Sequence, residues 1–224
     1  DMACMYRLHL RSRLSFRFLR EIGRFPCKNS GELYKGVQNE IDWQNWLQPN
    51  KSFRVDVTGF GECLSHTHFT ALQVKNAIVD FQRERWGLRS SIDLSNPDIR
   101  FHLHLANNQA VLSVDGSKSS LHKRGYRPVV GMAPIKETLA AGLIRMTGWD
   151  GTSNLVDPLC GSGTFLIEAV SILLGFSSGI DKQFLFKNWP DFDIEIWNRE
   201  LLIAKKMTNL NQKLPKIIGC DVDK

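Results

Sequence analysis

Hydrophobic and polar residues follow two different spacings along the chain, and these spacings predict both strands and helices. Apolar residues alternate with polar ones over residues 52–58, 99–105 and 110–114, and this period of two is typical of strands. Asn107 and Asn108 separate the last two runs, which favours a hairpin. Apolar residues recur at helical spacing in five further segments, namely residues 30–41, 65–86, 134–146, 165–173 and 194–210.

The first 25 residues contain the densest group of basic side chains. Residues 5–25 hold six arginines and one glutamate among leucine and phenylalanine. Apolar residues alternate from Leu14 to Phe18, which favours a strand there, whereas residues 8–13 could form the end of a helix. Arginines interleaved with aromatic rings could contact RNA through phosphates and stacking. They could equally protect an exposed edge strand from aggregation, and the pattern leaves both interpretations open.

Length and charge also indicate two parts. A chain of 224 residues with 42% hydrophobic residues can form one large domain or two modest ones. Residues 1–127 hold 19 Lys and Arg against 12 Asp and Glu, whereas residues 128–224 hold 10 against 11. A positive first half favours a polyanion partner, because it attracts phosphates and releases their counterions. A basic surface kept for solubility explains the same distribution equally well.

Cysteine spacing and the length of apolar runs limit the cellular context. The five cysteines form no Cys-x-x-Cys pair, which predicts free thiols in a reducing compartment and no zinc site. His102 and His104 share one face of a predicted strand, and we interpret them as exposed histidines because no third ligand lies nearby in sequence. The longest apolar run, residues 165–176, is too short to span a bilayer, and the N-terminus lacks a signal-peptide pattern. The sequence therefore predicts a cytoplasmic protein without a membrane or metal partner.

Residues 154–168 carry the most specific pattern in the chain. A short apolar run ends in Asp157, Gly161 and Gly163 follow, and then an apolar helical pattern begins. This order predicts a strand, a tight loop and a helix, with a ligand bound at the carboxyl end of the strand. A phosphate-binding P-loop needs a lysine after its last glycine, and the dinucleotide fingerprint needs a third glycine where Leu166 stands. Both of these ligand classes are therefore disfavoured.

The octet Asp157-Pro-Leu-Cys-Gly-Ser-Gly-Thr164 resembles the first cofactor motif of class I S-adenosylmethionine (SAM)-dependent methyltransferases, in the variant found in amino-group methylases. The resemblance implies a Rossmann-like domain with SAM as its cofactor. Residues 215–223 are predicted to form the next strand, where Asp221 could accept hydrogen bonds from both ribose hydroxyls and Val222 would pack on the adenine. The expected cofactor-binding residues are Asp157, Pro158, Cys160, Gly161, Ser162, Gly163, Thr164, Asp221 and Val222.

A second resemblance covers the first half of the chain. The predicted helix at 65–86, the hairpin at 99–114 and the phrase Leu121-His-Lys-Arg-Gly-Tyr-Arg127 are similar to the end of a THUMP domain, an RNA-binding module of enzymes that modify tRNA and rRNA. Residues 133–149 resemble the linker and first helix of bacterial THUMP-bearing methyltransferases, which methylate the exocyclic N2 of a guanosine in large-subunit ribosomal RNA. The RNA-binding residues expected on this basis are Lys75, Lys123, Arg124, Tyr126 and Arg127.

Together these patterns predict an α/β protein of two parts. Residues 1–127 are expected to form a THUMP-like RNA-binding region, and residues 128–224 the N-terminal part of a Rossmann-like class I methyltransferase domain. Residues 181–193 form an aromatic insertion that could fold over the site as a surface loop. The catalytic Asn/Asp-Pro-Pro-aromatic motif of the family does not occur, so we expect no catalytic residue here and an inactive internal fragment of a longer enzyme. A DNA adenine-N6 methylase and a non-catalytic RNA-binding protein remain alternative functions.

Overall fold

The computed structural model describes residues 1–61, 64–126 and 135–222, and the chain forms two compact units. Neither unit is a single continuous segment. The unit that carries the glycine-rich loop, here called the loop unit, consists of Asp1–Phe18, Ser119–Gln183 and Asp193–Lys224. The other, here called the sheet unit, consists of Leu19–Lys118 and Phe184–Phe192. The sequence-based division at residue 127 assigns residues 1–18 to the RNA-binding region, whereas by contacts they belong with the loop unit.

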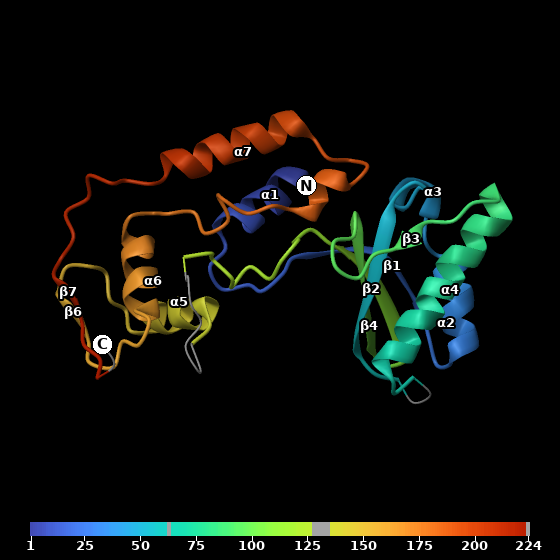
Figure 1. Ribbon diagram of the computed structural model, residues 1–224, viewed down its shortest axis with the longest axis horizontal. Coiled ribbons are helices and arrows are strands. Elements are labelled where there is room, and N and C mark those ends of the chain that lie inside the picture. Colours follow the sequence, from blue (N-terminus) through green and yellow to red (C-terminus); the bar gives the residue numbers. More distant parts are fainter. Residues whose placement is uncertain (62–63, 127–134, 223–224) are drawn as a thin grey trace. The chain divides into compact units, whose positions relative to one another are not determined.

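The sheet unit is built on one mixed sheet, and its helices α2 (Ser30–Asn39) and α4 (Thr67–Trp86) lie on the same face (Figure 1). Its strands are β1 (Leu19–Pro26), β2 (Ser52–Gly59), β3 (Ser91–Ile92), β4 (Ile99–Ala106) and β5 (Gln109–Asp115). Its helices are α2 (Ser30–Asn39), α3 (Trp43–Trp46), α4 (Thr67–Trp86) and the short 3-10 helix η1 (Leu185–Asn188). The strand order is β1-β5-β4-β2-β3, antiparallel from β1 to β4 and parallel from β4 to β3.

The predicted hairpin is confirmed, and its geometry follows from the sequence. Asn107 and Asn108 have φ of 52° and 56°, the left-handed values that a two-residue hairpin turn requires. Alternate residues of β4 are buried, from Ile99 to Leu105, and the ring centroid of Phe101 lies 5.2 Å from that of Trp43 in α3. The expected helices of this unit are also confirmed. Asn29 caps α2 by accepting a hydrogen bond from Glu32 N, and α4 ends at Gly87 with φ of 67°.

Residues 184–192, here called the strap, are part of the core of the sheet unit. Phe186 is fully buried, Trp189 is 3% exposed, and the Leu185 amide donates to the Gly116 carbonyl at 2.8 Å. The Arg20 guanidinium lies over the rings of both Trp46 and Trp189, with centroid distances of 5.0 and 5.8 Å. The prediction of a surface loop here is wrong, because the aromatic side chains of the strap have a hydrophobic core to join.

The loop unit contains α1 (Met2–Arg11), α5 (Glu137–Met146), β6 (Leu155–Asp157), α6 (Thr164–Leu173), α7 (Ile194–Lys206) and β7 (Ile217–Gly219), with β6 and β7 parallel. Helix α1 lies alongside α7 (Figure 1). The ring centroids of Tyr6 and Trp197 are 5.7 Å apart, and Arg7 pairs at 2.9 Å with Glu200, whose side chain is 1% exposed. The prediction of a strand over residues 14–18 is wrong, since this segment has no regular structure: it follows α1 and presents Leu14 and Phe16 to solvent.

The two units differ in net charge, and a division of the chain at residue 127 does not show this difference. The sheet unit holds 13 Lys and Arg against 12 Asp and Glu, and the loop unit holds 16 against 11. Much of the excess counted in residues 1–127 comes from arginines 7–17 and from residues 123–127, which belong to the loop unit. The positive excess therefore lies mainly on the unit that carries the glycine-rich loop. No helix in the described part of the chain is both long and apolar enough to cross a lipid bilayer.

Candidate cofactor site

The glycine-rich loop joins β6 to α6, and two of its glycines have backbone angles that favour glycine. Gly161 has φ of 51°, and Gly163, which caps the N-terminus of α6, has φ of 73°. A Cβ atom built on Gly161 would have no neighbour within 4 Å, and one on Gly163 would meet only Ile167 Cδ1 at 3.9 Å. Within the described residues, the space above the loop backbone is therefore open to a ligand.

Strand β7 brings Asp221 to this loop. The Cys220 amide donates to the Asp157 carbonyl at 2.9 Å, and the Cys160 amide donates to the Cys220 carbonyl at 2.9 Å. The Gly161 amide then donates to Asp221 Oδ2 at 2.6 Å. Residues that lie about 60 positions apart in sequence are thus held side by side at the carboxyl ends of two parallel strands, where open α/β sheets bind their ligands.

Only one oxygen of the Asp157 carboxylate accepts a hydrogen bond from the described residues. Its Oδ1 accepts from the Leu159 amide at 3.2 Å, but its Oδ2 is buried and accepts no hydrogen bond from the described residues. A buried acceptor without a partner is unfavourable, so this atom suits a ligand that brings a donor. Asp157 and Pro158 also line an apolar cavity of about 210 Å³ with α5 and Trp149. A second cavity, of about 540 Å³, lies in the sheet unit between β2 and α4.

The other residues expected at the cofactor differ in how accessible they are. Ser162 is exposed, and Val222 is 89% exposed just beyond β7. Thr164 is 3% exposed, and its hydroxyl lies 3.3 Å from that of Ser162, so its side chain faces the protein more than the open space. Cys160 is half-buried and packs towards β7.

Gly219 is a residue of this site that the sequence analysis missed. A Cβ atom there would lie 2.6 Å from Leu166 Cδ1 and 2.9 Å from Cys160 Sγ, so a larger residue would have to displace these two side chains. A glycine inside a predicted strand is itself a signal of close backbone approach, and Ile217-Ile218-Gly219 carries that signal.

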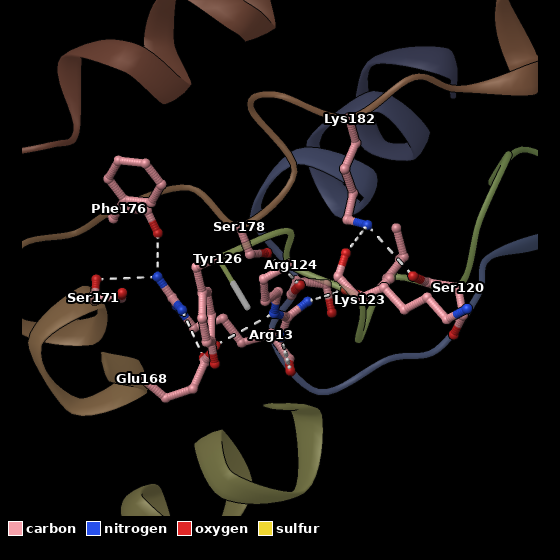
Figure 2. Close-up of polar contacts among 12 residues, drawn as sticks. Arg13, Ser120, Lys123, Arg124, Tyr126, Glu168, Ser171, Phe176, Ser178 and Lys182 are labelled. Carbon is pink, nitrogen blue, oxygen red and sulfur yellow. Dashed lines mark hydrogen bonds and ion pairs between the residues drawn. The ribbon is translucent and has the colours of Figure 1, made fainter. Parts of the chain in front are cut away.

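A buried ionic cluster supports α6 one turn beyond the loop (Figure 2). Glu168 is 1% exposed and accepts from Arg13 Nη1 at 2.9 Å and from the Tyr126 hydroxyl at 3.2 Å, with Arg124 Nε 3.5 Å away. Arg13 also donates to the carbonyls of Ser171 and Phe176. Burial lowers the pKa of the Arg13 guanidinium, and the nearby Glu168 carboxylate opposes that shift.

The residues expected to bind RNA lie in different surroundings. The Arg124 side chain is 4% exposed and donates to the carbonyls of Leu121 and Arg13, and Tyr126 is held by Glu168, so both take part in the buried cluster. Lys123 is exposed. Lys75 lines the cavity between β2 and α4 in the sheet unit, and Arg127 lies outside the described residues.

Two family models match the chain in the order that the two resemblances predict. A THUMP domain model matches residues 27–115, within the sheet unit, and a model described as "RMKL-like, methyltransferase domain" matches residues 124–224. The chain joins a THUMP domain to an RMKL-like methyltransferase domain. The predicted α/β fold, with a THUMP domain and a Rossmann-like methyltransferase domain, is confirmed.

Individual relatives agree with the family models. The chain is 47% identical over 206 residues to "Putative RNA methyltransferase slr0064" of Synechocystis sp., covering 92% of this chain and 53% of that protein. It is 43% identical over 204 residues to "Ribosomal RNA large subunit methyltransferase K/L" of Ectopseudomonas mendocina, covering 89% of this chain and 28% of that protein. A crystal structure of SMU.472, "a putative methyltransferase complexed with SAH", is 30% identical, with a TM-score of 0.85 over all of this chain and 59% of that one. The chain thus spans only part of the length of the relatives it matches.

Proposed function

We propose that the protein is a SAM-dependent RNA methyltransferase that methylates the exocyclic N2 of a guanosine in large-subunit ribosomal RNA. The observation that carries the proposal is that hydrogen bonds hold Asp157, Gly161 and Asp221 close together at the carboxyl ends of β6 and β7. The names of the relatives support a ribosomal RNA substrate, and the THUMP domain supports RNA as the polymer. The guanine N2 target rests on the family resemblance.

The residues of the loop suit SAM in three ways. The open backbone at Gly161 and Gly163 admits a ligand against the main chain. Asp157 Oδ2, which accepts no hydrogen bond from the described residues, offers an acceptor to a donor group, and Asp221 offers a second carboxylate for ribose hydroxyls. When bound, SAM supplies an electrophilic methyl group on a sulfonium. Cys160 is assigned a packing role against Gly219, because methyl transfer to an exocyclic amine needs no covalent enzyme intermediate.

The proposal is tested with the full-length protein, tritiated SAM and unmethylated large-subunit ribosomal RNA. We expect labelled RNA whose digestion yields N2-methylguanosine, and no label in duplex DNA. Label in DNA adenine would support the alternative DNA methylase instead. RNA binding without any SAM binding by calorimetry would support the non-catalytic alternative.

Replacing Asp221 with alanine is expected to weaken SAM binding by about 1–3 kcal/mol, because hydrogen-bonding groups of the ribose and the Gly161 amide lose their acceptor. The measurement is isothermal titration calorimetry of the full-length variant with SAM. Asp181→Ala is the matched control, since it removes an exposed carboxylate elsewhere in the same unit and should bind SAM like the parent. Equal SAM affinities of the two variants would show that Asp221 does not bind the cofactor.

A further inference from the structure

An exposed aromatic side chain of the loop unit, outside the glycine-rich loop, lies beside basic residues. Phe16 is 46% exposed, its ring lies 5.4 Å from the ring of His122 in an edge-on arrangement, and Lys136 Nζ lies 5.2 Å from its centroid. Lys123 is exposed on the same segment as His122, and Lys182 donates to the carbonyls of Ser120 and Lys123. These five residues, Phe16, His122, Lys123, Lys136 and Lys182, are here called the Phe16 platform.

The backbone beneath the Phe16 platform is fixed by hydrogen bonds. The Leu121 amide donates to the Phe16 carbonyl at 2.8 Å, which ties the segment after α1 to the segment before α5. Arg124 donates to the carbonyls of Leu121 and Arg13, and Lys182 bridges the other side of the same turn (Figure 2). A platform that is already ordered loses little conformational entropy when a ligand binds.

Positive charge accumulates around the platform. Burial lowers the pKa of His122, and Lys136, Lys123 and Lys182 lower it further, while Glu137 opposes them. Burial also lowers the pKa of Lys182, with Arg124 and Lys123 acting in the same direction and Glu137 against it. Neighbouring cations that depress each other's protonation create a positive potential, and an anion brought to the platform would relieve it.

We propose that the Phe16 platform binds single-stranded RNA, with a base stacked on Phe16 and phosphates on Lys136 and Lys123. The inference rests on the proposed function and adds a contact surface to it. Proteins bind single-stranded nucleic acids with aromatic rings beside basic side chains. Every base has an aromatic face that can stack on such a ring, and every phosphodiester carries a negative charge. The charge favours RNA over an apolar protein partner, which would leave the lysines unpaired.

The stacking contact is tested with Phe16→Leu in the full-length protein. We expect about tenfold weaker binding of a fluorescein-labelled, mixed-sequence 12-nucleotide RNA, since leucine offers no aromatic ring on which a base can stack. The slope of log affinity against log salt should not change, because no charge is lost. Phe176→Leu is the matched control, as Phe176 is 41% exposed in the loop unit and the change keeps its backbone carbonyl, and it should bind like the parent.

The phosphate contact is tested with Lys136→Gln and the same RNA. The salt slope should fall by about 0.7, the value for one phosphate contact on a single strand. Lys205→Gln, which removes one exposed positive charge from α7, should leave the slope unchanged. The proposal that the platform binds RNA is wrong if Phe16→Leu and Lys136→Gln both behave like their controls. It is also wrong if the parent protein does not bind the 12-nucleotide RNA. If ribosomal RNA is still methylated in either case, the proposed function stands without the platform.

Discussion

Replacing Glu168 with alanine is expected to lower the free energy of unfolding by about 3–5 kcal/mol, the typical result of removing one partner from a buried ionic group. Glu168 is 1% exposed and is the carboxylate that Arg13 and Arg124 both face, and their side chains are 7% and 4% exposed. Without it, two buried guanidinium groups lose their counter-charge. Urea denaturation followed by circular dichroism measures the change.

Glu21→Ala is the matched control for this prediction. Glu21 pairs with Arg24 at 2.8 Å, but both side chains are largely exposed, so the loss of this pair should cause no measurable change. Glu168→Gln keeps hydrogen-bonding atoms in place while removing the charge, and its stability should fall between those of the parent and the alanine variant. A Glu168→Ala protein as stable as the Glu21→Ala protein would show that Arg13 and Arg124 do not depend on this carboxylate.

Replacing Gly163 with valine is expected to abolish detectable SAM binding. Its Cβ would have only one neighbour in the chain, Ile167 Cδ1 at 3.9 Å, so the added side chain would occupy the open space above the loop. Calorimetry with the full-length variant measures the loss. A non-glycine residue at φ of 73° also costs about 1–2 kcal/mol of stability, and this effect has to be separated from the loss of ligand space.

Gly148→Val separates the two effects. Gly148 follows α5 with φ of 70°, and a Cβ there would have no neighbour within 4 Å, so the backbone strain is closely matched. Both variants should lose similar thermal stability, but only Gly163→Val should lose SAM binding. Unchanged binding by Gly163→Val would mean that the cofactor does not lie against this loop.

The parts of the structure that could be predicted are those encoded by neighbouring residues. The hairpin, α2 and α4 follow from local periodicity and from caps such as Asn29 and Gly87. The strand, loop and helix around Gly161 follow from a contiguous motif. In each case the residues that determine the structure lie within a few positions of one another, so a single sequence is enough to reveal it.

The parts that could not be predicted depend on contacts between distant residues. Arg13 and Glu168 are 155 positions apart, and nothing local marks an arginine within a basic run as the one that will be buried. Alternation over residues 14–18 resembles a strand, but Leu14 and Phe16 face solvent because their segment has no neighbouring strand to pair with. The sequence of the strap predicts a loop because the residues that it contacts, Trp46 and Gly116, lie far away in sequence.

Each unit is built from segments that are far apart in sequence. This arrangement determines when each unit can finish folding during translation. Helix α1 is synthesised before the rest of both units, but its Arg7 pairs with Glu200, which the ribosome adds 193 residues later. At elongation rates of about 5–20 residues per second, that delay lasts roughly 10–40 s. Folding of the sheet unit is delayed as well, because its strap is synthesised only just before α7. A nascent chain that stalls before residue 184 therefore leaves both units unfinished and accessible to chaperones and proteases.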